Sequence, residues 1–152
     1  MNLFGVMEVS ASALAAERLR AEVVAANMAN AETTRTADGS GPYRRQNVVF
    51  TSAAPESFAS QLVGQAGDLS DPDGAEIGGV QVSAVVEDST PPLRRYDPGH
   101  PDADKDGYVS YPDINPVTEM VDLMGATRAY DLNSSAIQAE KGMVSTSLDI
   151  LK

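Results

Sequence analysis

The most constraining feature of the sequence is a long proline-free segment at its carboxyl end. Asn115 is a favourable N-cap, Pro116 suits the first helical position, and no proline follows before Lys152. A helix of about 36 residues is about 54 Å long, whereas a compact globule of this chain length is about 40 Å across. The chain is therefore predicted to be elongated, or to bury this helix against other chains.

The same segment carries a heptad seam, in which residues recur at alternating spacings of three and four. Three of its positions are polar and two glycines lie within the helix, so an isolated two-stranded coiled coil is predicted to be weak. The seam consists of Met120, Leu123, Thr127, Tyr130, Ser134, Ile137, Lys141, Val144, Leu148 and Leu151.

A second helix is predicted near the amino terminus, over about residues 4–30, which contain no proline and many strong helix formers. Asn27 lies on its inner stripe, and Asn30 suits the position that follows a helix end. Because both terminal helices are amphipathic and rich in small residues, we expect them to pack in an assembly. The apolar members of the stripe are Val6, Val9, Ala13, Ala16 and Val23.

The region between the helices is predicted to be β-rich, and all nine prolines lie at positions 42–116. Residues 43–50 indicate a strand, residues 80–87 alternate as a half-buried strand does, and residues 93–96 form a possible short partner. Several glycines and acids over 64–79 indicate a flexible loop.

The predicted fold class is therefore α+β. Long N- and C-terminal helices are expected to pair as a coiled-coil-like stem, with a small β-rich domain inserted between them. The expected domains are an N-terminal helix (1–34), a β-rich middle domain (35–114) and a C-terminal helix (115–152).

The composition excludes several classes of function. The net charge is −11, which is unfavourable for binding nucleic acid or an anionic membrane. The chain has no cysteine and a single histidine, His100, so thiolate chemistry and multi-histidine metal sites are excluded. No segment has the length of an apolar membrane span, and the amino terminus lacks the features of a cleaved Sec signal. No nucleotide-binding or nucleophile motif occurs, so neither an enzyme nor a cofactor is expected.

One acidic stretch has the spacing of a calcium-binding loop. Asp102, Asp104 and Asp106 precede Gly107 as in the first half of an EF-hand loop, and oxygen ligands suit Ca²⁺. The twelfth position is Asp113 rather than glutamate, and prolines on both sides disfavour flanking helices. We interpret the stretch mainly as an acidic turn, and a calcium-binding module is the alternative function.

Two segments resemble the signatures of the bacterial flagellar basal-body rod protein family. Residues 12–34, which begin Ser-Ala-Leu-Ala-Ala-Glu-Arg and end Asn-Ala-Glu-Thr-Thr, resemble its amino-terminal signature. Residues 115–130, Asn-Pro-Val-Thr-Glu-Met-Val-Asp-Leu-Met-Gly-Ala-Thr-Arg-Ala-Tyr, resemble its carboxyl-terminal signature. Between them, residues 41–46, 78–82, 96–104 and 107–109 resemble the proximal rod member of that family.

The resemblance implies a structural subunit of the proximal rod, whose terminal helices form a hollow shaft that transmits torque from motor to hook. The implied partners are other rod subunits, copies of the same chain and the flagellar type III export apparatus, without a cleaved Sec signal or membrane insertion. The implied location is the periplasm-spanning rod of the basal body. The expected assembly residues are Val6, Val9, Ala13, Ala16, Val23, Asn27, Asn30, Met120, Leu123, Arg128, Tyr130, Ile137, Val144, Leu148 and Leu151.

Overall fold

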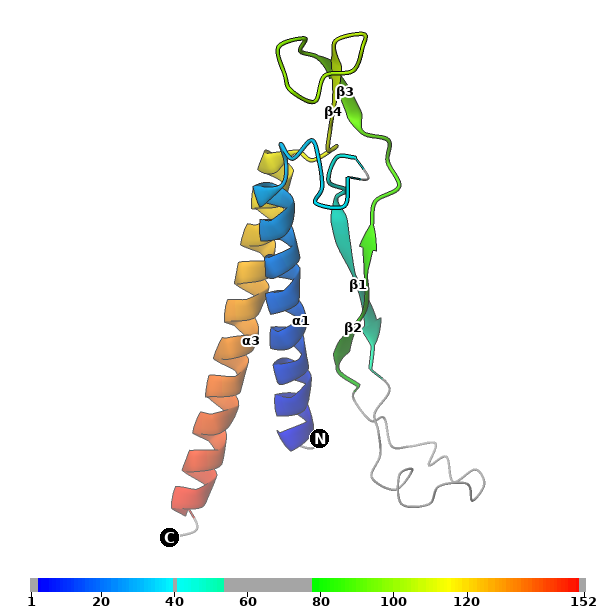
Figure 1. Ribbon diagram of the computed structural model, residues 1–152. Helices are drawn as coiled ribbons and strands as arrows, with labels where there is room; N and C mark the ends of the chain where they lie inside the picture. The colour runs from blue at the N-terminus through cyan, green and yellow to red at the C-terminus, as the bar shows by residue number, and fades with distance from the viewer. Residues whose placement is uncertain (1–2, 40, 54–77, 151–152) are drawn as a thin grey trace, which may run out of the picture.

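The chain is elongated and is built on two long antiparallel helices. The computed structural model describes residues 3–39, 41–53 and 78–150. Helices α1 (Leu3–Ala29) and α3 (Pro116–Ile150) lie side by side, and short strands lie beside and beyond them (Figure 1). Two long terminal helices with small sheets between them confirm the predicted α+β class.

Local sequence signals set the ends of both helices. The backbone N–H of Val117 donates a hydrogen bond of 3.0 Å to the Asn115 side-chain oxygen, which caps α3 as predicted. Glu119 in the first turn is favourably placed for the helix dipole. At the end of α1, the Asn30 side chain donates a 2.9 Å hydrogen bond to the carbonyl of Ala26. The same carbonyl accepts the backbone N–H of Asn30 at 3.1 Å, so Asn30 binds the last turn of α1 through both its backbone and its side chain.

The four strands form two separate antiparallel pairs within the described residues. Strand β1 (Gln46–Ser52) pairs with β2 (Val80–Glu87), and this ribbon packs against α1. Strand β3 (Leu93–Tyr96) pairs with β4 (Tyr108–Tyr111) at the far end of the molecule (Figure 1). The loop predicted over 64–79 lies outside the described residues except for its last two glycines.

Two expectations about the strands were wrong. Residues 93–96 pair with β4, a neighbour in the sequence, instead of with residues 80–87. Strand β2 is mostly exposed, with Val82 its one partly covered residue. The reason is that, among the described elements, the narrow ribbon packs against α1 alone, which covers few of the β2 side chains. A register shift between Val49 and Phe50 further breaks the regular alternation of inner and outer residues.

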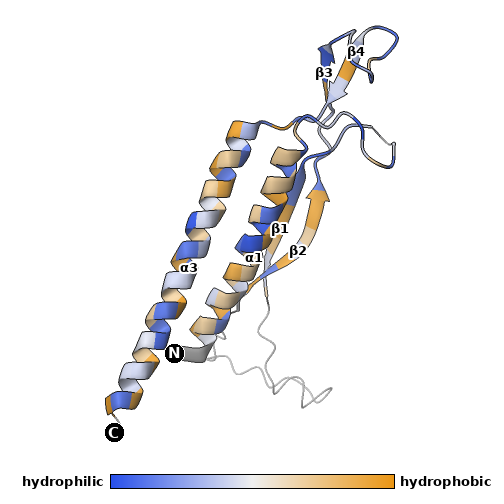
Figure 2. Cartoon of the chain, turned by 60° about the vertical axis from the view of Figure 1, so that its left-hand side comes forward, coloured by the Kyte–Doolittle hydropathy of each residue, from blue (hydrophilic) through white to orange (hydrophobic). Residues whose placement is uncertain are grey.

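The interface between α1 and α3 is small and partly polar. Its buried apolar residues include Ala16, Val23 and Ala126, and Figure 2 shows hydrophilic and hydrophobic positions interspersed along both helices. Glu119 and Glu140 of α3 are also buried, and one carboxylate oxygen of Glu140 has no hydrogen bond. Burying an unpaired carboxylate oxygen is unfavourable, so apolar packing alone does not account for how the helices pair.

Candidate assembly interface

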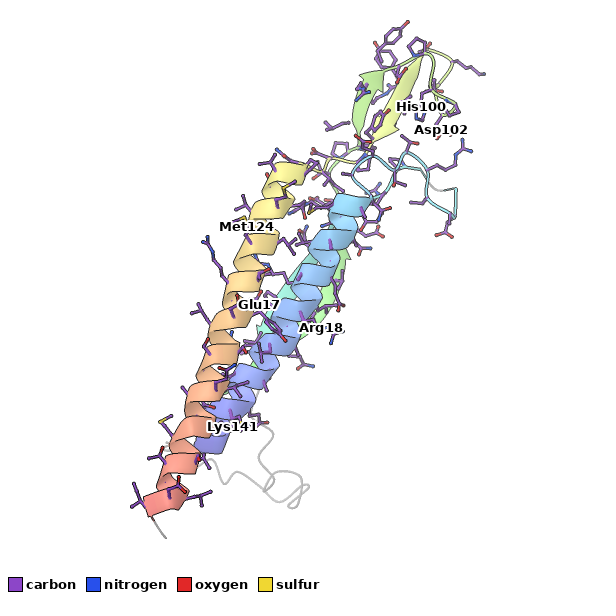
Figure 3. All side chains as sticks on the ribbon, turned by 90° about the vertical axis from the view of Figure 1, so that its left-hand side faces the viewer. Glu17, Arg18, His100, Asp102, Met124 and Lys141 are labelled. Carbon is purple, nitrogen blue, oxygen red and sulfur yellow. The ribbon has the colours of Figure 1, made fainter. Side chains whose placement is uncertain are left out.

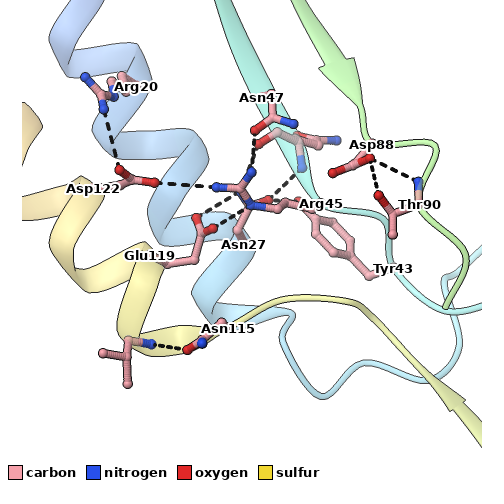
Figure 4. A network of polar contacts seen from close by, with 12 residues as sticks. Arg20, Asn27, Tyr43, Arg45, Asn47, Asp88, Thr90, Asn115, Glu119 and Asp122 are labelled. Atoms are coloured by element: carbon pink, nitrogen blue, oxygen red, sulfur yellow. Dashed lines mark hydrogen bonds and ion pairs between the residues drawn. The ribbon is translucent and has the colours of Figure 1, made fainter. Parts of the chain in front are cut away.

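A buried ion pair joins the ribbon to the helices where α1, α3 and β1 meet. The Arg45 guanidinium Nε donates to Glu119 Oε1 at 2.6 Å, and Asn27 Nδ2 donates to Glu119 Oε2 at 3.2 Å (Figure 4). Glu119 and Asn27 are each 1% exposed. The Glu119 carboxylate is therefore removed from water but keeps a partner for each oxygen, which a buried charge requires.

Asn27 uses its whole amide group to hold the start of β1. Its Oδ1 accepts a 2.9 Å hydrogen bond from the Gln46 N–H, and its Nδ2 donates at 2.9 Å to the Gln46 carbonyl. The Tyr43 hydroxyl donates to the same Oδ1 at 3.2 Å. Burial raises the pKa of the Tyr43 phenol above its ordinary value, and the carboxylates of Glu87 and Glu119 raise it further.

A second, weaker set of ion pairs surrounds this centre. Asp122 lies 3.5 Å from the Arg45 guanidinium and 3.7 Å from that of Arg20 on α1. Arg20 also lies 3.8 Å from Glu17. These side chains are partly exposed and the distances are long, so each pair contributes little to stability. Arg45, Glu119 and Asn27 therefore form the centre of what we call the junction cluster.

The junction cluster determines how three elements meet. Glu119 can be satisfied only when Asn27 is at the same height on α1, which fixes the register of the two helices. Arg45 can reach Glu119 only when β1 starts beside them. Buried polar groups of this kind specify an arrangement more than they strengthen it.

The heptad seam of α3 faces α1 only in part. The side of α3 that faces α1 carries the buried residues Glu119, Ala126 and Glu140. Each of them directly precedes a residue of the heptad row that begins at Met120. The rotation of α3 about its own axis follows from the pairing of Glu119 with Asn27, which turns the seam partly away from α1. The half-buried seam residues are Leu123, Ser134, Ile137 and Val144, and the exposed ones are Met120, Thr127, Tyr130, Lys141 and Leu148.

The other expected assembly residues lie in several environments. Arg128 is exposed, and Leu151 lies outside the described residues. On α1 and after it, Ala16, Val23 and Asn27 are buried, Val9, Ala13 and Asn30 are half-buried, and Val6 is at the limit of exposure. Half of the α3 seam is therefore exposed in the single chain, whereas most of the α1 stripe is buried or half-buried.

Nothing in the sequence pattern indicated that Arg45, Glu119 and Asp122 belong to one site. The partner of Arg45 is 74 residues away in the chain, so no local pattern identifies it. The available signal was a glutamate directly before the first seam residue, where it lies on the inner side of an amphipathic helix.

The acidic stretch forms a turn that side-chain contacts hold to the segment after α1. Asp102 accepts a 2.8 Å hydrogen bond from the Thr34 hydroxyl and pairs with the Arg35 guanidinium at 2.6 Å. His100 Nδ1 accepts the backbone N–H of Asp102 at 3.1 Å (Figure 3 labels both residues). Gly107 has a φ of 78°, a conformation that favours glycine in such a turn.

This turn does not gather ligands for an ion. In the part of the chain that the structure describes, no three acidic or imidazole side chains are grouped to hold a metal. Asp104 is exposed and lies 3.6 Å from the guanidinium of Arg94, while Asp106 is exposed.

Neither α1 nor α3, the two long helices of the described residues, is apolar enough over its length to cross a bilayer.

Comparison with known proteins places both ends of the chain in one family. A family model described as flagella basal body rod protein matches residues 7–35, and one described as flagellar basal body rod FlgEFG protein C-terminal matches residues 105–150. These segments contain most of α1 and all of α3.

Curated relatives match over their full length. The flagellar basal-body rod protein FlgC of Bacillus subtilis is 43% identical over 155 residues, with all of both chains covered. That of Borreliella burgdorferi is 40% identical, covering all of this chain and 99% of the relative. That of Salmonella typhimurium is 38% identical, covering 99% and 98%.

Proposed function

The chain belongs to the FlgC family of flagellar basal-body rod proteins, and we propose that it builds the proximal rod through its two terminal helices. It is a structural subunit of the rod. In the proposed assembly the helices pack in a coiled-coil-like manner against copies of the chain and other rod subunits. The rod formed in this way is a hollow shaft that carries torque from motor to hook.

The observation that carries this proposal is the uncovered apolar face of α3. Met120, Tyr130 and Leu148 belong to the heptad seam, yet each is at least 42% exposed in the single chain. Apolar positions repeated along a helix over many turns are suited to a second helix. Contacts between different surfaces of identical or related subunits generate open helical assemblies, which is the geometry of a rod.

The division of the chain into three parts fits this role. We assign residues 1–34 and 115–152 to the rod core and residues 35–114 to an outer β-rich part. The junction cluster links the core and the outer part, because Arg45 belongs to the middle region and Glu119 to α3. A lateral load on the outer part is thereby passed to both helices.

Export and location follow from the same proposal. A subunit of the periplasm-spanning rod has to leave the cytosol, and we propose the flagellar type III apparatus as its route, with no cleaved Sec signal. The relatives are named as flagellar basal-body rod proteins, and we propose no catalytic role for this chain.

The test is an in-frame deletion in the source bacterium, complemented with variants and scored by motility and electron microscopy of basal bodies. The deletion is expected to give non-motile cells with rings but no completed rod. Leu148→Asp is expected to be exported but absent from rods, because the charge would lie in an apolar contact. Ser145→Asp, at an exposed polar position on the same turn, is the matched control and should restore motility. Complete rods in the deletion strain would refute the proposal.

A further inference from the structure

Two glutamates are buried on the side of α3 that faces α1, and they differ in how they are satisfied. Glu119 is 1% exposed and has a partner for each carboxylate oxygen, namely Arg45 and Asn27. Glu140 is 4% exposed, its Oε2 has no hydrogen bond, and none of the ion pairs among the described residues involves it. Because an unpaired buried carboxylate is unfavourable, Glu140 needs a partner that the single chain lacks.

Glu140 lies near the end of the helix pair that is farther from the sheets. The helices are antiparallel and Asn27 is bonded to Glu119, so Glu140 lies level with about Val6, one turn from the start of α1 at Leu3. The positive end of the α1 dipole is therefore close to the carboxylate. A helix dipole is equivalent to only about half a unit charge, so it compensates the carboxylate in part.

No basic residue in the described part of the chain can reach Glu140. Lys141 follows it directly, but it is exposed, and successive helix residues point about 100° apart (Figure 3 labels Lys141). Arg18 on α1 and Arg128 on α3 are each about 18 Å away along the helix axis. The other described basic residues lie farther still, at the junction cluster or beyond it. Positions 46–87, which include both strands beside α1, contain no lysine, arginine or histidine.

A basic side chain fits this carboxylate better than water or a metal ion does. A water molecule can donate a hydrogen bond to Oε2, but it leaves the charge of the carboxylate uncompensated. No group of three acidic or imidazole side chains suited to a metal occurs among the residues that the structure describes. A lysine or arginine side chain supplies both the opposite charge and several N–H donors.

The surface beside Glu140 is open to another chain. Met143 follows Glu140 by about one turn and is 53% exposed, and Leu148 follows it by about two turns and is 59% exposed. The two apolar side chains lie on either side of the line that Glu140 occupies along the helix. Apolar contacts around a polar centre exclude water from it, which is the usual arrangement at the centre of a protein interface.

We propose that Glu140 receives a lysine or arginine side chain of a neighbouring rod subunit when the rod assembles. The inference rests on the proposed rod function and names a residue through which subunits recognise one another. Only about one turn of α1 lies beyond Glu140, so a small displacement of that turn admits the basic side chain. The incoming charge removes the cost of burying the carboxylate, so closure of this end of the helix pair and binding of the neighbour favour each other.

The stability of the purified chain tests whether Glu140 lacks a partner of its own. Glu140→Leu is expected to raise the midpoint of urea unfolding, whereas Glu119→Leu, at the matched buried position that has partners, is expected to lower it. Gln138→Leu, at an exposed position nearby, is expected to leave the midpoint nearly unchanged. A lower midpoint for Glu140→Leu would mean that the chain itself satisfies the carboxylate, and the inference would be overturned.

Counts of completed rods in the bacterium test the need for the charge. Glu140→Gln keeps the size of the side chain and removes its charge, so it is expected to reduce completed rods at least about tenfold. Cell fractionation is expected to show that this chain still leaves the cytosol in the natural amount, and Gln138→Leu should give normal rods. Rods lost on deletion of the chain but normal with Glu140→Gln would overturn this contact and leave the rod function intact. Retention of the Glu140→Gln chain in the cytosol would overturn it as well.

Motile revertants identify the donor of the charge. Glu140→Arg, encoded so that no single base change restores glutamate, sets a like charge against the incoming one and is expected to abolish motility. Revertants are expected to replace one particular lysine or arginine of this chain or of another rod subunit by an acidic or neutral residue. A collection of revertants in which no basic residue is ever replaced would contradict the inference.

Discussion

Replacing Arg45 by methionine removes the partner of a carboxylate that water cannot reach. Glu119 is 1% exposed and would keep only the 3.2 Å hydrogen bond from Asn27. Breaking a buried ion pair on one side costs about 3–5 kcal/mol. Because the Arg45 side chain is itself 27% exposed, some water can enter, and we expect a loss of about 3 kcal/mol in the free energy of unfolding.

The decisive comparison is the sign of the stability change that a second substitution, Glu119→Leu, causes in each chain. In the natural chain, Glu119→Leu should cost about 1–2 kcal/mol, since it removes the charge-assisted bond to Arg45. In the Arg45→Met chain, the same Glu119→Leu should raise stability by at least about 1 kcal/mol, since it removes an unpaired buried charge. Urea unfolding followed by circular dichroism at pH 7 measures all four chains.

A control for charge alone comes from Arg94→Met. Arg94 pairs at 3.6 Å with Asp104 on the surface, and its loss should change stability by less than about 0.5 kcal/mol. If Glu119→Leu destabilises the natural and the Arg45→Met chains equally, the reasoning about a coupled buried pair is refuted.

Three further predictions concern single positions. The raised pKa of Tyr43 means that its neutral phenol is favoured by folding, so stability should be constant below pH about 9 and fall as pH rises above about 10. Urea unfolding of Tyr43→Phe, with a shallower decline, checks this. Gly79→Ala should cost about 1–3 kcal/mol, because its Cβ would collide with the Ser12 hydroxyl, which accepts the N–H of Val80 at 3.0 Å. Gly125→Ala meets open space in a helix and should instead raise the free energy of unfolding by up to about 1 kcal/mol, as measured by the same urea unfolding.

The helices could be predicted from the sequence because their determinants are local. The Asn115 cap, Pro116 at the first position and the long stretch without proline each act within a few residues. The pairing of the strands could not be predicted in this way, because it depends on which segments lie close together in space. Leu93–Tyr96 pairs with β4 because the turn around Asp102, held by the Thr34 hydroxyl, brings the chain back beside it.

The candidate site could be predicted only as two stripes on helices. Periodicity shows that a helix has an apolar side, but the rotation of that side toward a given neighbour depends on specific contacts. Here the bond between Asn27 and Glu119 sets that rotation, and it joins residues 92 positions apart. The heptad seam is therefore half-buried at some positions and exposed at others in the single chain.

The position of the junction cluster gives the helix pair a gradient of local stability. Asn27–Glu119 and Arg20–Asp122 both link α1 to α3 in the half nearest the sheets. In the far half, Glu140 is buried with a carboxylate oxygen that has no hydrogen bond, and Leu148 and Ile150 near the end of α3 are exposed. Opening of the pair therefore costs least at the carboxyl end of α3 and most at the cluster. Amide hydrogen exchange should slow progressively from Ile150 toward Glu119, so that α3 separates from α1 at its carboxyl end first while the sheets keep their place.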